Sequence, residues 1–289
     1  MKEQEMKPKP LLASAKVQNL GHKTRAWVAM LLFLLAARWL QAAELKQETL
    51  RVWDQYIQAL DVNRESRMAG NEAFLLVEDL PDSQRRLQQN EVVVFNHDPH
   101  RVPQGMIHHW VGAIFIPDMS LDQAMSVLTN YGRYGEVYNQ LLKSCSVLER
   151  KDDNVELSVI AVQKAMSVTA AVAVDNQIHI DRLDSKRVSI TSNATRIQEI
   201  ANYGQPSEHP FPEDRRPGYV WRAVVNERLE ERDGGVYVEL ETVALSRGIP
   251  IEFRWLIKPL TDELPRKMIV EMLNDTRAAL SNGESVASK

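Results

Sequence analysis

Histidines are the residues of this sequence whose type and spacing most suggest chemistry, because four of the seven fall between positions 97 and 109. The stretch NHDPH supplies His97, Asp98 and His100, and GMIHHWVGAIFIP supplies His108 and His109. Imidazole and carboxylate groups so placed can hold a transition metal. Consecutive strand residues point to opposite faces, however, so His108 and His109 cannot bind one ion together. We therefore favour hydrogen-bonding histidines over a metal centre and expect no cofactor.

Motifs for nucleophilic catalysis or phosphate binding are missing from the sequence. The lone cysteine, Cys145, lies in the strand-like stretch KSCSVLE, where such a residue is typically a small buried hydrophobe. The acidic cluster ERLEERD at 227–233 is typical of the solvated edge of a hairpin. A formal net charge of −4 provides no basic field for nucleic acid, so we expect no such partner. No catalytic residue is predicted by motif.

Residues 1–43 have the layout of an export signal, in which Lys and Arg residues precede an apolar run from Ala26 to Ala37. The run is shorter than the roughly 20 apolar residues that a membrane-spanning helix needs. We therefore expect a cleaved signal peptide and an exported protein of the periplasm or cell envelope. The alternative is an uncleaved anchor that associates the protein with a membrane.

The region 44–104 is predicted to be an N-terminal helical and extended segment in front of the main domain. Leu50, Trp53, Ile57 and Leu60 recur at three- and four-residue spacings, which predicts an amphipathic helix over 45–62. The loop NHDPHRVPQG, with two prolines and a glycine, then marks the boundary of the domain 105–284. Residues 285–289 are predicted to be a disordered tail.

The domain 105–284 is predicted to begin with a strand at 105–117 and a helix whose capping box joins Ser120 and Gln123. Further strands are predicted at 141–150, 155–163, 165–174, 178–183 and 187–200. The clearest hairpin, 219–246, turns at DGG. A long final helix is expected, with Pro265 in its first turn and Asn282 and Gly283 at its end.

Alternation along the hairpin predicts a dry face and a wet face. Trp221, Val225 and Leu229 share one face of the first strand, and Val238 and Leu240 share one face of the second. The opposite faces carry Asn226, Arg228, Glu239 and Glu241. A curved antiparallel sheet must bury its dry face, and the final helix has the only long apolar stripe downstream that can cover it. The expected fold class is therefore α+β, a helix-grip sheet wrapped around the C-terminal helix.

Several blocks of sequence carry a resemblance to a known family. They are IHHWVGAIFIP at 107–117, SLDQAMSVLTNY at 120–131, TRIQEI at 195–200, WRAVVNERLEERDGGVYVELETVALSRGIP at 221–250 and WLIKPLTDELPRKMI at 255–269. In this order they resemble the START-like, or SRPBCC, helix-grip superfamily, and within it a group of exported, acidobacteria-like proteins. The resemblance covers about two-thirds of the chain. It implies a cavity of the kind that lipid and sterol carriers and polyketide cyclases use. The group is rich in lysine, tyrosine and arginine around 160–175, where this chain has AVQKAMSVTAAVAV.

An apolar small molecule such as a lipid, isoprenoid or polyketide is the expected ligand, held between sheet and final helix by a carrier or sensor. The candidate binding residues are His109, Trp110, Arg196, Trp221, Val225, Val238 and Leu240, with Tyr131 or Tyr134 near the mouth. Alternation within 105–117 does not tell whether the face of His108 or that of His109 looks inward.

Two alternatives use the same sequence features. An enzyme of the cyclase or aromatase kind would polarise a carbonyl group with His109 and with Arg196 or Glu227. Such an enzyme needs several convergent polar groups, whereas these strands offer mostly Val, Ile and Ala, so we favour the carrier. An envelope protein without a ligand would instead dock onto a partner through the helix at 45–62.

Overall fold

The computed structural model describes residues 47–165, 168–211, 220–248 and 254–287. They belong to a compact unit that runs from Glu44 to Lys289. The predicted leader, residues 1–43, lies outside the described residues. Within the described ranges, no helix combines the length and the apolar character that crossing a bilayer requires.

The described residues begin with helices and then form a sheet. The first helices are α2 (Gln47–Met68), η1 (Leu76–Asp79) and α3 (Ser83–Gln88). The strands are β1 (Val93–Val102), β2 (Gly105–Pro117), β3 (Leu142–Lys151), β4 (Asn154–Ala165), β5 (Val168–Arg182), β6 (Arg187–Ala201), β7 (His209–Pro210), β8 (Val220–Arg232) and β9 (Gly235–Arg247). Between β2 and β3 lie α4 (Leu121–Leu128), η2 (Tyr131–Arg133) and α5 (Tyr134–Val137), and α6 (Arg254–Ala287) ends the fold.

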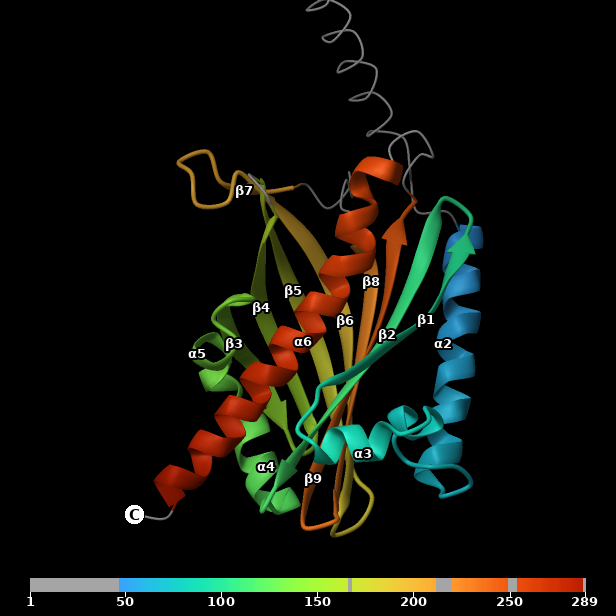
Figure 1. Cartoon of the computed structure of the whole chain (residues 1–289). Helices are drawn as coiled ribbons and strands as arrows, with labels where there is room; N and C mark the ends of the chain where they lie inside the picture. The colour runs from blue at the N-terminus through green and yellow to red at the C-terminus, as the bar shows by residue number, and fades with distance from the viewer. Residues whose placement is uncertain (1–46, 166–167, 212–219, 249–253, 288–289) are drawn as a thin grey trace, which may run out of the picture. The chain divides into compact units, whose positions relative to one another are not determined.

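All strands belong to one antiparallel sheet with the order β1-β2-β9-β8-β6-β5-β4-β3, and β7 pairs with β6. Figure 1 shows α6 lying diagonally across one face of this sheet, and we name this the inner face. Trp53 of α2 packs against Ile107 and Val243 on the opposite, outer face. This arrangement confirms the predicted α+β helix-grip architecture, with an additional helical cover on the outer face.

The inner-face core joins the sheet to α4 and α6. Ile114, Val238 and Leu229 lie opposite one another on β2, β9 and β8 and share one cluster with Ile269 and Leu273 of α6. The predicted capping box of α4 is confirmed, because the Ser120 side chain accepts from the Gln123 amide and the Gln123 side chain accepts from the Ser120 amide. Apolar alternation and local capping thus place α4 and α6 on the same side of the sheet.

Gly112 allows α6 to approach β2 closely. A Cβ atom at this position would lie 2.4 Å from Cγ2 of Ile269 and 2.8 Å from Cδ1 of Leu273. These distances are shorter than van der Waals contact, so a side chain there would push the helix away from the strand.

Three element boundaries differ from those predicted. The loop NHDPHRVPQG, taken as a domain boundary, lies mostly in β1, which pairs with β2, so this strand belongs to the same sheet. Asp175 and Asn176, expected to separate two strands, lie inside the continuous β5, where a register shift against β6 accommodates them. Helix α6 begins at Arg254 and continues to Ala287, so Pro265 and Gly283 both lie within it. Their helix-breaking tendency is overridden by the surrounding helix.

Candidate functional site

The inner face has an open part, whose side chains keep accessible surface, and a sealed part, whose side chains are buried. Residues paired across β2, β9 and β8 form rows that belong to one part or the other. The two open rows are His108, Ala244 and Ala223, then Trp110, Thr242 and Val225, and all six residues keep accessible surface. A border row follows with Gly112, Leu240 and Glu227. Beyond it, the sealed row of Ile114, Val238 and Leu229 is fully buried. Figure 1 shows the N-terminal half of α6 crossing the end of the sheet where the open rows lie.

Glu227 is the acidic residue at the border between these parts. Its register partners are Leu240 on β9 and Ile190 on β6, and Val225 and Leu229 share its face along β8. All four neighbours are apolar, and burial raises the pKa of the Glu227 carboxyl group to about 7. The side chain nevertheless keeps part of its surface accessible. A carboxyl group with this pKa exchanges its proton near neutral pH.

Three tyrosines from η2, α5 and the turn after α5 lie near this carboxyl group. Tyr131, Tyr134 and Tyr138 contact each other edge to face, with ring centroids 5.1 Å apart in each consecutive pair. Burial, and next the Glu227 carboxylate, raise the pKa of each phenol. The Tyr134 hydroxyl donates to the Leu128 carbonyl. The Tyr131 hydroxyl is buried and has no hydrogen-bond partner among the described residues.

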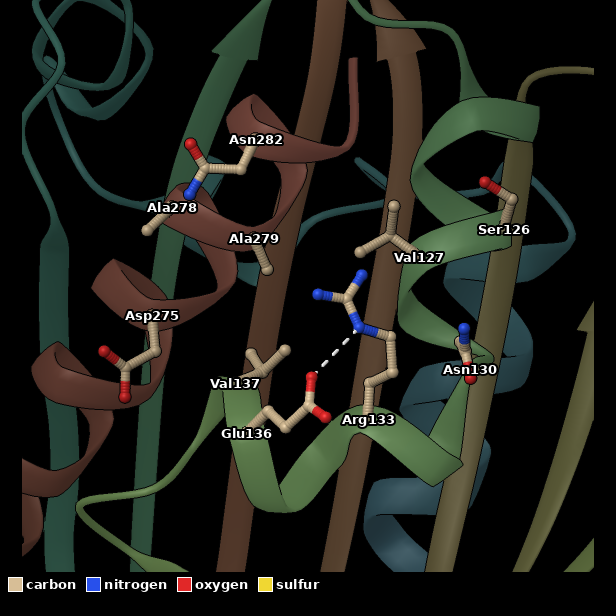
Figure 2. Close-up of a pocket in the computed structure, with 10 residues that line it drawn as sticks. All are labelled: Ser126, Val127, Asn130, Arg133, Glu136, Val137, Asp275, Ala278, Ala279 and Asn282. Atoms are coloured by element: carbon tan, nitrogen blue, oxygen red, sulfur yellow. Dashed lines mark hydrogen bonds and ion pairs between the residues drawn. The ribbon is translucent and has the colours of Figure 1, made fainter. Parts of the chain in front are cut away.

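A groove of about 560 Å³ opens between α4, α5 and α6. Figure 2 shows Asp275, Ala278, Ala279 and Asn282 of α6 facing Ser126 and Val127 of α4, Asn130, Arg133, and Glu136 and Val137 of α5. Arg133 and Glu136 form an exposed ion pair across its floor, with Nε and Oε2 3.4 Å apart. No residue predicted for the ligand site is among the described residues that line it. We interpret it as a solvated surface groove, because its ion pair of Arg133 and Glu136 is exposed, whereas Asp275 is half-buried and burial raises the pKa of its carboxyl group.

A second, smaller groove of about 400 Å³ lies on the other side of the η2 turn. It shares Ser126 and Asn130 with the first groove and adds Tyr131, Val147 and Arg150. The Arg150 guanidinium lies 5.8 Å from the centre of the Tyr131 ring, close enough for a cation–π interaction. Tyr131 is thus the predicted site residue that borders a groove on the surface.

Six of the nine predicted binding residues lie on or beside the inner face. Trp110 and Val225 belong to the open rows, whereas Leu240 and Val238 lie in the border and sealed rows. Tyr131 and Tyr134 belong to the same apolar cluster. The structure thus brings these six side chains to the α6 side of the sheet.

The other three predicted residues, His109, Arg196 and Trp221, lie on the outer face. His109 alternates with Trp110 on β2 and is covered by α2. Arg196 binds Asp175, with Nε and Oδ2 2.7 Å apart, on the face opposite Leu157. A β-bulge between Val220 and Arg222 shifts the alternation of β8, so the Trp221 ring packs beside Trp53. For these three positions the expectation of an inward-facing wall is wrong.

On the outer face of the hairpin, Arg228, Glu239 and Glu241 are buried. The expectation that this face is solvated is therefore wrong. Arg228 and Glu239 are 2% and 0% exposed, and Nη1 donates to Oε1 over 3.0 Å. Arg228 Nη2 also donates to Glu241 over 2.8 Å, and His109 Nε2 lies 2.8 Å from the other Glu241 oxygen. Burial acts to raise the pKa of Glu241, but the bond to His109 and the charge of Arg228 lower it to about 2. The outer face holds an internal polar network rather than a solvated surface.

This network extends into the segment that precedes the sheet. The backbone amides of Leu76 and Val77 in η1 donate to the two carboxylate oxygens of Glu239, over 3.1 and 2.7 Å. The Tyr56 hydroxyl of α2 lies 2.9 Å from His109 Nδ1. Each carboxylate therefore has several donors, and α2 and η1 are fixed to the sheet by polar as well as apolar contacts.

Three of the four clustered histidines, His97, His100 and His109, lie near α2, whereas His108 lies on the inner face. The rings of His97 and His109 stack with centroids 4.2 Å apart, and Tyr56 lies 5.9 Å from His100. In the described part of the chain, no group of three or more His, Cys, Asp or Glu side chains could hold a metal ion. These imidazoles instead contribute stacking and hydrogen bonds.

Glu227 in the border row and Tyr138, whose ring contacts Tyr134, were not predicted as binding residues, although the sequence held a signal for Glu227. Glu227 has the same parity as Val225 and Leu229, so alternation alone places it on the apolar face. The motif analysis instead assigned Glu227 to a solvated acidic cluster and to the enzyme alternative. Tyr138 has no such signal, since its hydroxyl meets Thr276 of α6 at 2.9 Å only after the fold closes.

Comparison with known proteins gives matches by structure alone. No protein-family model matches the sequence, and no curated protein is significantly similar to it. The aromatase/cyclase Zhui from a Streptomyces species matches with a TM-score of 0.43 and 11% identity over 62% of this chain and 94% of its own. A STAR-related lipid transfer protein from Xanthomonas axonopodis gives 0.42 and 13% over 65% and 98%. A START superfamily protein from Mycobacterium smegmatis, of the superfamily that the sequence resembles, gives 0.39 and 8% over 60% and 97%.

Proposed function

We propose that this protein binds an apolar small molecule, of the lipid, isoprenoid or polyketide kind, between the inner face of its sheet and α6. The observation that supports this proposal is the contrast between rows of the same face. Trp110, Val225 and Thr242 keep accessible surface, whereas the row of Ile114, Val238 and Leu229 is fully buried. Apolar side chains that fold to the α6 side without being sealed provide a surface that an apolar ligand can cover.

A carrier or sensor is the role that these residues support best. The enzyme alternative required His109, together with Arg196 or Glu227, to polarise a carbonyl group in the cavity, but His109 and Arg196 lie on the outer face in hydrogen bonds and ion pairs of their own. The docking alternative required a free apolar face on the first helix. Instead, Trp53, Ile57 and Leu60 of α2 pack against the outer face of the sheet. Neither alternative retains the groups it needs.

Native mass spectrometry of the protein, purified from its envelope fraction without detergent, tests the proposal directly. We expect a bound mass that solvent extraction releases, and saturable binding of the neutral apolar dye N-phenyl-1-naphthylamine. Val225→Trp should reduce dye affinity several-fold by filling the open rows. Val62→Trp is the matched control, because Val62 is 62% exposed on α2. An empty protein that also fails to bind the dye would contradict the proposal.

Export to the cell envelope is part of the same proposal and is supported by the signal layout of residues 1–43. Cell fractionation with N-terminal sequencing of the recovered protein tests it. A mature chain that begins at Glu44 in the periplasmic or envelope fraction is the expected result. Recovery of the chain with its leader in the cytosol would contradict it.

A further inference from the structure

Glu227 differs from the other charged residues of the central strands because it lacks a partner. Glu231, on the same strand, accepts from the Leu121 amide over 2.7 Å and pairs with Lys186. Arg228 pairs with Glu239 and Glu241. For Glu227 no hydrogen bond or ion pair with another described residue is present, and its surroundings affect its pKa through burial alone. A carboxylate in apolar surroundings without a donor is strongly destabilised.

The position of Glu227 indicates that a bound ligand could supply the missing partner. The residue stands where the open rows meet the border row, directly after Val225 on the same face. It keeps accessible surface there, although burial raises its pKa. A molecule that covers Trp110 and Val225 would therefore have one end beside this carboxyl group.

The chemistry around Glu227 selects the kind of polar end that fits. A carboxylate or phosphate group would be repelled by the ionised side chain, and a hydroxyl group would supply only a neutral hydrogen bond. A protonated amine would supply both a donor and the missing counter-charge. The nearby ring system of Tyr131, Tyr134 and Tyr138 also favours cations, and Arg150 already lies over one of these rings.

We propose that Glu227 is the recognition site for a protonated amine at the polar end of an otherwise apolar ligand. This inference rests on the proposed binding of an apolar molecule at the open rows and specifies its class. The buried, unpartnered hydroxyl of Tyr131, whose pKa the Glu227 carboxylate raises, is a second polar group near this carboxyl group. The ligand is thus a cationic amphiphile rather than a fatty acid or a phospholipid anion.

Recognition of an amine has a characteristic pH dependence. The Glu227 carboxyl group ionises with a pKa of about 7, and an alkylamine stays protonated across pH 6–8, as a lysine side chain does. Affinity for the amine should therefore increase as the pH rises from 6 to 8. Affinity for a carboxylate ligand should decrease over the same range, and affinity for an alcohol should stay constant.

A matched set of ligands on the full chain tests the proposal. Decylamine and decanoate below their micelle concentrations, and decanol below its solubility limit, are used to displace N-phenyl-1-naphthylamine from the wild-type protein at pH 6 and pH 8. At pH 8 we expect decylamine to bind about tenfold more tightly than decanol, and decanoate to bind more weakly than both. At pH 6 the advantage of decylamine over decanol should shrink several-fold.

Glu227→Gln keeps the size of the side chain and removes its charge. This variant should lose both the preference for decylamine over decanol and the pH dependence of that preference. Glu156→Gln, at a half-buried position of β4 where the carboxylate accepts from Gln177, removes the same net charge and should change nothing. It controls for general attraction of an amine to the acidic protein.

The outcomes separate the two proposals. If decylamine and decanol bind equally and Glu227→Gln matches the wild type, amine recognition is overturned, while binding of an apolar ligand stands. A preference for decylamine that Glu156→Gln abolishes equally would also overturn it. If the dye binds but none of the three ligands displaces it, amine recognition is overturned; if the protein is empty and the dye does not bind, both proposals fail.

Discussion

The acidic side chains on the two faces of the central hairpin have opposite surroundings. On the outer face, Glu239 and Glu241 are nearly inaccessible, and each is surrounded by donors from Arg228, from backbone amides or from His109. On the inner face, Glu227 lies one residue from Arg228 in sequence and has apolar neighbours alone among its register partners. The same short stretch, ERLEERD, therefore contains a structural network and an unpartnered acid.

This difference indicates which residues serve the fold and which remain for a ligand. The outer network pairs its charges within the chain, so its removal should damage stability. Glu227 carries an electrostatic cost that no described residue offsets, so its removal should improve stability. Stability measurements on variants of the two faces therefore test whether the faces differ in this way.

The largest effect is expected for Arg228→Leu. Without the guanidinium, Glu239 and Glu241 lose their shared cation within the buried network, and the free energy of unfolding should fall by about 3–5 kcal/mol. Urea denaturation at pH 7 measures it. Arg85→Leu is the control, since Arg85 is 60% exposed in its ion pair with Asp82 and should change stability by less than ~1 kcal/mol. Equal, small losses in both variants would contradict the structural role of the network.

Glu227→Gln should stabilise the protein increasingly as the pH rises above about 4.5, with the full effect above about pH 7. Folding raises the pKa of this carboxyl group from its ordinary 4.5 to about 7, so the folded state favours the protonated form. The wild type should therefore lose stability as the pH rises from about 4.5 through 7, on the order of 3 kcal/mol in total. The Gln variant should lack this loss, and Glu156→Gln should retain it. Denaturation midpoints at pH 5 and pH 8 that shift in parallel for all three proteins would refute this prediction.

Gly112→Ala tests the close approach of α6 to the inner face. The added methyl group would lie 2.4 Å from Ile269 Cγ2, and we expect a loss of about 1–3 kcal/mol from overpacking. Gly135→Ala is the control, because a Cβ atom there meets no atom within 4 Å. Thermal unfolding by circular dichroism should show a lower midpoint for the first variant alone.

The smallest effect is expected for Tyr56→Phe, which removes the hydroxyl group that joins α2 to His109 over 2.9 Å. The loss of one hydrogen bond to a half-buried group should cost about 1 kcal/mol in urea denaturation. Tyr203→Phe, in the turn after β6, serves as the surface control, with an expected change of less than ~0.5 kcal/mol. An unchanged Tyr56→Phe variant would show that α2 is held by its apolar contacts alone.

The strand and helix pattern of the main domain was predictable because local rules specify it. The DGG turn of the hairpin has positive φ at Asp233 and Gly234, as predicted from residues that tolerate this conformation. The capping box at Ser120 placed the start of α4. Alternation placed Val225, Leu229, Val238 and Leu240 on the α6 side of the sheet.

Long-range features of the site were less predictable, because they depend on what covers each face. Trp221 changed face through a bulge, which shifts alternation by one residue and leaves no mark in a single sequence. His109 was ambiguous because either face of β2 could have been the inner one. Only the packing of α2 over Ile107 and of α6 over Gly112 resolves that choice.

The sequence by itself determined an α+β chain with a DGG hairpin, a capped α4 and a long C-terminal helix, because turns, caps and periodicity act over a few residues. The tertiary structure alone decided that the acidic cluster divides between two environments. Arg228 and Glu239 became buried when η1 and α2 covered the outer face, and Glu227 became isolated among Leu240 and Ile190. Whether a charge is paired depends on neighbours that are distant in sequence, and these neighbours meet only when the sheet and its helices close.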